Sequence, residues 1–98
     1  MSELEARLTA LAAAGGTTTY GALARDLSWR MGELTAALER LMVEDSAAGR
    51  PLRAALLRGR LSGDLPARGF FDTAAALGYD VSDPAGFVAW HRMALRGA

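Results

Sequence analysis

Arginine is the residue type in this chain best suited to bind a charged ligand. All 11 basic residues are arginine, for which codon usage in a GC-rich genome is a sufficient explanation. Guanidinium groups bind phosphates through several N–H donors at once. Residues 50–68 hold the densest cluster, with Asp64 as the only acidic residue among them. The arginines of this segment are Arg50, Arg53, Arg58, Arg60 and Arg68, and the last four are the candidates for contact with nucleic-acid phosphates.

The sequence contains no pattern typical of a catalytic or metal site. The single histidine, His91, has no partner motif, and we expect it to be a partly exposed helix residue. Glu44 and Asp45 are adjacent, which places them about 100° apart on a helix, and we expect both to be solvated. The chain has no cysteine, which excludes disulfides and sulfur-ligated metals. We expect no enzymatic activity, no cofactor and no metal.

Length and composition predict one compact domain over residues 1–98. The chain has 98 residues, of which 51% are hydrophobic and 22% charged, enough for a single modest core. No apolar run approaches the roughly 20 residues that span a membrane. The first residues lack the basic and apolar regions of a secretory signal. We therefore expect a cytoplasmic protein without membrane contact.

Residues 1–49 are predicted to form three helices. Ser2 and Glu5 match a capping box at the start of the first helix, which Gly15-Gly16 ends. The extended residues 17–19 lead into a second helix over 20–27. A break at Ser28-Trp29 precedes a third helix, whose apolar face is Met31, Leu34, Leu38, Leu41 and Met42. This order predicts a mainly α fold, with a winged helix-turn-helix core in residues 1–49.

Residues 50–69 are predicted to be an arginine-rich wing, hairpin or loop. Residues 52–57 would be a strand in a winged helix, but Arg, Ala and Leu favour a helix started by Pro51. Both alternatives remain open from the sequence. Residues 70–98 predict two additional C-terminal helices, the first ended by Gly78 and the second started by Asp83-Pro84.

A family resemblance lies in residues 17–34. The run Thr19-Tyr20-Gly21-Ala22-Leu23-Ala24, followed by Arg30-Met31-Gly32, resembles the DNA-binding domain of the alkylguanine-DNA alkyltransferases and alkyltransferase-like proteins. The resemblance implies a winged-helix scaffold, with Tyr20 against a phosphate and Arg30 entering the base stack. In place of that family's P-C-H-R or P-W-H-R motif the chain has Arg50-Pro51-Leu52-Arg53, which excludes methyl transfer.

These features predict a small winged-helix DNA-binding protein, a transcriptional regulator of a bacterium or mobile element. Duplex DNA would contact the start of the third helix and the arginine-rich wing, and the last helix would form a homodimer. Acidic residues along the third helix restrict base contact to its first turn. The candidate contact residues are Thr18, Thr19, Tyr20, Ser28, Trp29, Arg30, Arg53, Arg58, Arg60 and Arg68.

The alternative is a non-enzymatic protein-interaction module that docks on a larger partner such as a polymerase or nuclease. Aromatic residues commonly anchor such interfaces. The candidate anchors are Trp29, Phe70, Phe71 and Trp90.

Overall fold

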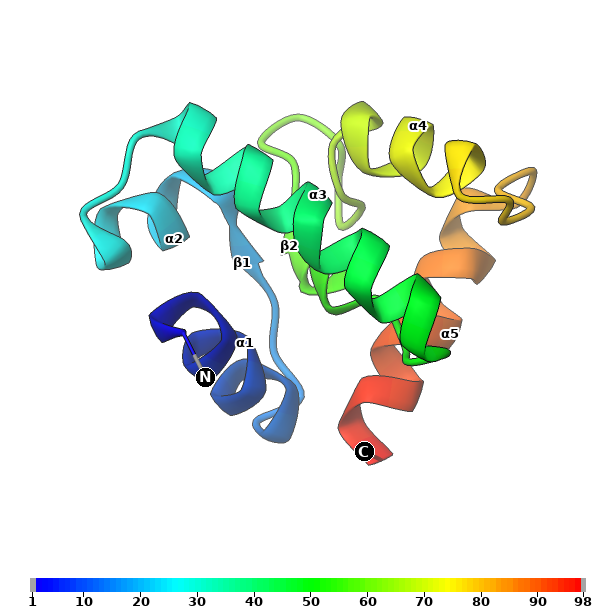
Figure 1. The fold of residues 1–98 in the computed structure, drawn as a ribbon, viewed down its shortest axis with the longest axis horizontal. Helices are drawn as coiled ribbons and strands as arrows, with labels where there is room; N and C mark the ends of the chain where they lie inside the picture. The colour runs from blue at the N-terminus through cyan, green and yellow to red at the C-terminus, as the bar shows by residue number, and fades with distance from the viewer. Residues whose placement is uncertain (1, 98) are drawn as a thin grey trace.

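A computed structural model describes residues 2–97, which form a mainly helical fold (Figure 1). The α-helices are α1 (Glu3–Ala13), α2 (Tyr20–Leu27), α3 (Met31–Ala48), α4 (Arg68–Ala76) and α5 (Pro84–Gly97). A short 3₁₀ helix, η1 (Arg53–Leu56), leads directly into β2 (Leu57–Arg58). β2 pairs in parallel with β1 (Thr18–Thr19). The predicted mainly α architecture with two C-terminal helices is therefore present.

Local sequence signals set the ends of the first three helices. The Ser2 hydroxyl accepts from the Glu5 N–H at 3.2 Å, and the Glu5 carboxylate accepts from the Ser2 N–H, which completes the predicted capping box. The Thr19 hydroxyl accepts from the Ala22 N–H and caps α2. Gly49, at φ 69°, ends α3 in the left-handed conformation that glycine adopts at little cost.

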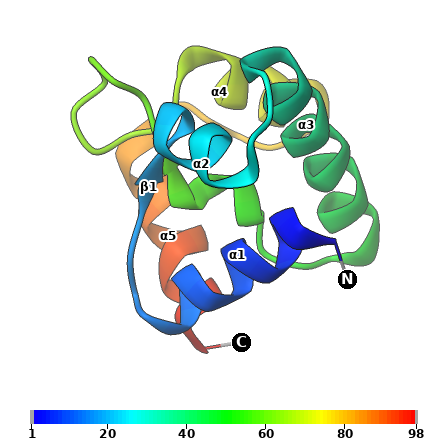
Figure 2. The same cartoon turned by 90° about the vertical axis from the view of Figure 1, so that its left-hand side faces the viewer.

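The segment after α3 combines parts of both alternatives left open by the sequence. Residues 53–56 form one 3₁₀ turn, and only Leu57 and Arg58 are a strand. A parallel pair replaces the predicted hairpin, because β2 aligns with the strand that precedes α2. Residues 59–67 form a loop that projects from the body of the molecule (Figures 1 and 2).

The core is centred on η1. This turn packs against α1, α3 and α5, and it buries Ala54, Ala55 and Leu56. Figure 2 shows α1 and α5 on one side of this central segment, with α2, α3 and α4 on the other. Small alanine side chains let three helices approach a single turn closely. Among residues 2–97, no helix combines the length and apolar character that crossing a membrane requires.

The structure corrects several expectations about burial. Asp45 and His91 are buried at 0% and 3% exposure, because α3 and α5 pack on both sides of η1 and its flanking residues. Conversely, Met31 is exposed, although the apolar pattern placed it on the apolar face of the third helix.

Candidate functional site

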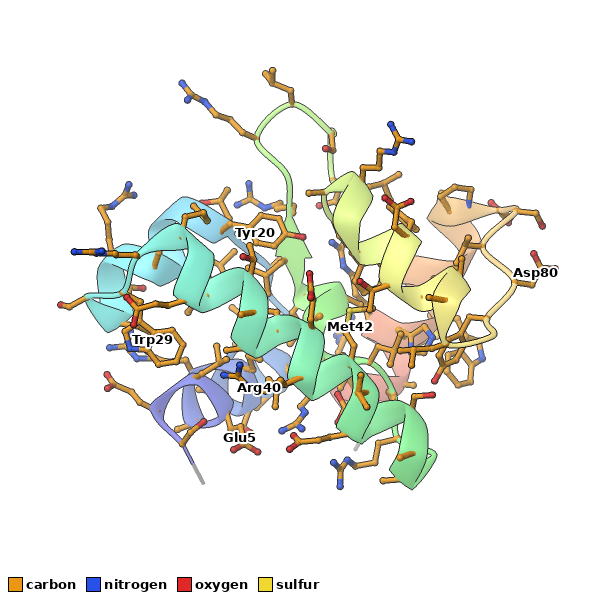
Figure 3. The ribbon with its side chains drawn as sticks, turned by 45° about the horizontal axis from the view of Figure 1, so that its top comes forward. Glu5, Tyr20, Trp29, Arg40, Met42 and Asp80 are labelled. Atoms are coloured by element: carbon orange, nitrogen blue, oxygen red, sulfur yellow. The ribbon has the colours of Figure 1, made fainter. Side chains whose placement is uncertain are left out.

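A groove opens between α2, the first two thirds of α3, the loop of residues 59–67 and the start of α4. Its volume is about 770 Å³, within the range of ligand pockets in proteins. Tyr20 and Met42 lie on this side of α3, whereas Trp29 and Arg40 lie on the side that faces α1 (Figure 3).

The floor of the groove is apolar. Leu38 and Met42 of α3, Ala54 of η1 and Phe70 of α4 line it and are themselves almost fully buried. These side chains belong to the hydrophobic core. The core therefore lies directly beneath the groove, and a ligand there would remove from water the apolar surface of the more exposed lining residues, such as Met31.

A glycine of α4 leaves open space beside the groove. Gly69, in the first turn of α4, lines it, and a Cβ placed there would meet no atom within 4 Å. Gly32, in the first turn of α3, is equally open but is not part of the lining. The two positions form a matched pair, one inside and one outside the groove.

Two arginines stand on the edge of the groove. Arg25 of α2 and Arg60 of the loop are exposed, and neither pairs with a carboxylate in the described chain. The Arg25 guanidinium lies over Gly21, 3.9 Å from where a Cβ would stand. Glu39 of α3 is the one acidic residue of the lining. The edge therefore carries a net positive charge.

Tyr20 connects α2 to the beginning of α4. Its hydroxyl accepts from the Ala67 N–H at 3.1 Å. Burial raises the pKa of Tyr20, so the phenol is neutral at physiological pH. Its hydroxyl therefore holds the wall of the groove in position.

The N-terminus of α4 forms part of the same wall and has no side-chain cap. Its N-cap residue is Ala67, and its first turn contains no acidic residue. Arg68 occupies that turn, and its contact with Asp72, at 3.8 Å, joins two strongly exposed side chains. An arginine at this end opposes the helix dipole, which favours anions.

The predicted contact residues do not form one face. Thr19, Tyr20 and Arg60 line the groove, whereas Trp29 lies in a shallow depression on the opposite side of α3. Thr18 is paired with Leu57 in the sheet. The remaining exposed members are Ser28 in the turn after α2, Arg30 at the start of α3 and Arg68 in α4.

Two of the predicted wing arginines are held by the protein itself. The Arg53 guanidinium binds Asp45 at 2.9 Å and Glu5 at 2.9 Å, with its side chain only 17% exposed. Arg53 is therefore part of the interior and not of an extended wing. Arg58 donates to the Thr17 hydroxyl at 3.0 Å, across the two-stranded sheet.

A buried ion network around Asp45 is the largest polar feature that the sequence did not reveal. Asp45 accepts from the Arg53 backbone N–H, the Arg53 guanidinium and the Arg50 Nε. The hydrogen bond from Arg53 lowers the pKa of Glu5 to about 2. Hydrogen bonding to Asp45 is the main cause of the raised pKa of Arg53. The network joins α1, α3 and η1.

His91 has a structural role next to this network. Its Nδ1 accepts from the Leu52 N–H at 2.9 Å, which requires the proton to be on Nε2. Burial lowers the pKa of His91, and the charge of Asp45 opposes that shift. The neutral imidazole thus satisfies the backbone just before η1.

The polar groups of the groove lining are hydroxyls, one carboxylate and two guanidiniums, and no histidine is among the lining residues. No protein-family model, curated protein or solved structure matches this chain. The resemblance of residues 17–34 to the alkyltransferase domain stays a prediction.

Proposed function

We propose that this chain is a non-enzymatic docking domain whose groove receives apolar side chains of a partner protein. The observation that carries the proposal is the apolar floor of the groove, where core residues such as Leu38 and Phe70 border an open cavity of about 770 Å³. Pockets that desolvate an apolar anchor contribute most of the binding energy in protein interfaces.

The charge distribution favours this function over contact with a duplex along α3. The exposed surface of α3 carries Glu33, Glu39 and Glu44, which repel phosphates. The interior position of Arg53 removes one cation from the predicted wing. Only Glu39 of these three carboxylates lines the groove, so a protein segment docked there meets one of them and not all three.

Selection from a random peptide library tests the docking function. The library would be selected on the wild type and counter-selected on Gly69→Trp, which adds a bulky side chain to the wall of the groove. We expect enriched peptides that bind the wild type and Gly32→Trp and do not bind Gly69→Trp. The Gly32→Trp control carries the same substitution in an equally open first turn outside the groove.

Failure to enrich any peptide, or equal binding to both glycine variants, would contradict the proposal. Circular dichroism of the two variants shows whether each remains folded. Because a Cβ at either position meets open space, we expect both variants to unfold close to the wild-type temperature.

DNA binding by a winged-helix-like regulator is the second candidate. It is supported by four exposed arginines near the N-termini of α3 and α4 or on the groove edge: Arg25, Arg30, Arg60 and Arg68. The turn of residues 28–30 between α2 and α3 is short enough for a helix-turn-helix.

Salt dependence tests this second candidate. Release of counterions from four neutralised phosphates gives a log–log slope of affinity against salt of about −3.6. Fluorescence anisotropy with a random duplex at about 50 and 200 mM salt measures it. A slope near zero, or no binding at the lower salt, would count against DNA as the ligand.

A further inference from the structure

We infer that the groove accepts an acidic amphipathic helix of the partner protein. This inference rests on the docking function proposed above and adds the conformation and charge of the occupant. It is carried by the backbone around the groove, by its length along α3 and by the cations at its edge.

On the β2 side of the groove, the backbone groups that could pair with an added strand are already used. The Leu57 carbonyl accepts from Arg92 at 3.3 Å, and the Gly59 N–H donates to the Leu65 carbonyl at 2.8 Å. A peptide that adds a strand needs free donors and acceptors on a neighbouring edge. Insertion of side chains from a helix needs none, because a helix satisfies its own backbone.

The length of the groove fits about three turns of helix. Met31 and Met42 both line it and are 11 positions apart on α3, which corresponds to about 16 Å at the helical rise. A helix lying alongside α3 would present apolar residues at i, i+4 and i+7 to the floor over this distance. The occupant is therefore a short segment of about 11 residues.

The charge of the edge selects acidic flanking residues. Arg25 and Arg60 come from α2 and the loop, and Glu39 is the one acidic residue of the lining. Both arginines are exposed and have no carboxylate partner among residues 2–97. Glutamate or aspartate beside the apolar stripe of the partner would pair with them, while lysine there would be repelled.

The N-terminus of α4 places a further cation beside the groove. Ala67 and Gly69 of this helix end line the groove, and Arg68 lies between them with a strongly exposed side chain. The N–H of Ala67, the N-cap residue, already donates to the Tyr20 hydroxyl. A carboxylate of the partner would be attracted to Arg68 and to this end of the helix dipole.

The composition of the selected peptides tests the inference. A library of about 14-residue random peptides would be selected in parallel on the wild type and on Arg25→Glu/Arg60→Glu. From the wild type we expect apolar residues at helical spacing with Asp or Glu beside them. From the charge-reversed variant we expect Lys or Arg at the same flanking places, and acidic peptides should bind it at least about tenfold more weakly.

The matched control is Arg40→Glu/Arg96→Glu, which changes the net charge equally at two exposed arginines outside the groove. This control should select the same acidic peptides as the wild type. Peptides without acidic enrichment, or with an alternating or proline-rich pattern, would overturn the inference and leave the docking function standing. An empty pool would overturn both, and duplex DNA binding lost in Gly69→Trp alone would assign the groove to nucleic acid instead.

Discussion

Arg53 and Arg25 are the same residue type in opposite environments, and the difference decides what each can do. Arg53 lies among Asp45, Glu5 and η1, so its donors are used inside the protein. Arg25 stands on the groove edge with its donors open to a ligand. Loss of Arg53 would leave Asp45 buried with a weaker set of partners, and a buried charge that loses its partner is strongly destabilising.

Arg53→Ala should therefore lower the free energy of unfolding by about 3 kcal/mol. Urea unfolding followed by circular dichroism measures the change. Arg40→Ala, at an exposed arginine, should change it by no more than about 0.5 kcal/mol. Equal effects of the two substitutions would mean that the Asp45 network does not contribute to stability.

His91 makes stability dependent on pH. Its pKa in the folded protein is below the ordinary value of 6.5, because burial disfavours the imidazolium. The unfolded chain then binds more protons as the pH falls below about 6.5, so the free energy of unfolding decreases with acidification. Protonation of Nδ1 also removes the acceptor of the Leu52 N–H.

We expect the wild type to be less stable at about pH 5.5 than at pH 7.5, and His91→Asn to lose part of that difference. Asparagine keeps an oxygen near the position of Nδ1, so it can still accept from Leu52. Urea unfolding of both proteins at the two pH values checks this. An unchanged pH dependence in the variant would contradict the role of His91, because Glu5, with its pKa lowered from 4.5 to about 2, affects stability only at more acidic pH.

At the scale of elements, the sequence predicted the helix ends that are determined by contacts between nearby residues. The starts of α1, α2 and α5 depend on the side chains of Ser2, Thr19 and Asp83, which act within a few residues. η1 and β2 depend on distant partners, because Arg92 of α5 donates to the Ala55 carbonyl at 2.7 Å and β1 pairs with Leu57. No sequence pattern within residues 50–58 indicates those long-range contacts.

The groove could not be predicted from the sequence for the same reason. Its lining comes from residues as far apart as Thr19 and Phe70, and neither position shows by itself that a cavity lies between them. Tyr20 was singled out, but as a phosphate contact, and its bond to the Ala67 N–H was not foreseen. The arginine count likewise could not separate Arg60, on the groove edge, from Arg53 in the interior.

The turn between α2 and α3 offers a test at this scale. Ser28 ends α2 at φ 57° and ψ 38°, a left-handed conformation that disfavours side chains with a Cβ. Ser28→Gly should raise the free energy of unfolding by about 0.5–1 kcal/mol, after the greater chain entropy of glycine is subtracted. Ser46→Gly, the same substitution inside α3, should lower it by a similar amount. Thermal unfolding distinguishes the two signs.

At the scale of the whole molecule, the net charge is zero, but the surface is divided into regions of different character. The groove and its arginines involve α2, α3, α4 and the loop, and no residue of α5 lines it. The exposed large apolar residues of α5 are Trp90 and Met93, at 64% and 74% exposure. A homodimer through α5, as predicted from the sequence, would therefore leave the groove free to bind a partner.

Self-association through α5 should be weak if Trp90 and Met93 are its main contacts. A stable dimer buries about 800 Å² on each partner, more than two side chains on one helix supply. We expect sedimentation equilibrium to show a monomer at low micromolar concentration and a mass that rises only as the concentration increases. Trp90→Ser/Met93→Ser should remain monomeric throughout and should bind groove-selected peptides as the wild type does, because the two surfaces share no residue. A double variant that still dimerises would place the interface elsewhere, and one that loses peptide binding would show that the two surfaces are coupled.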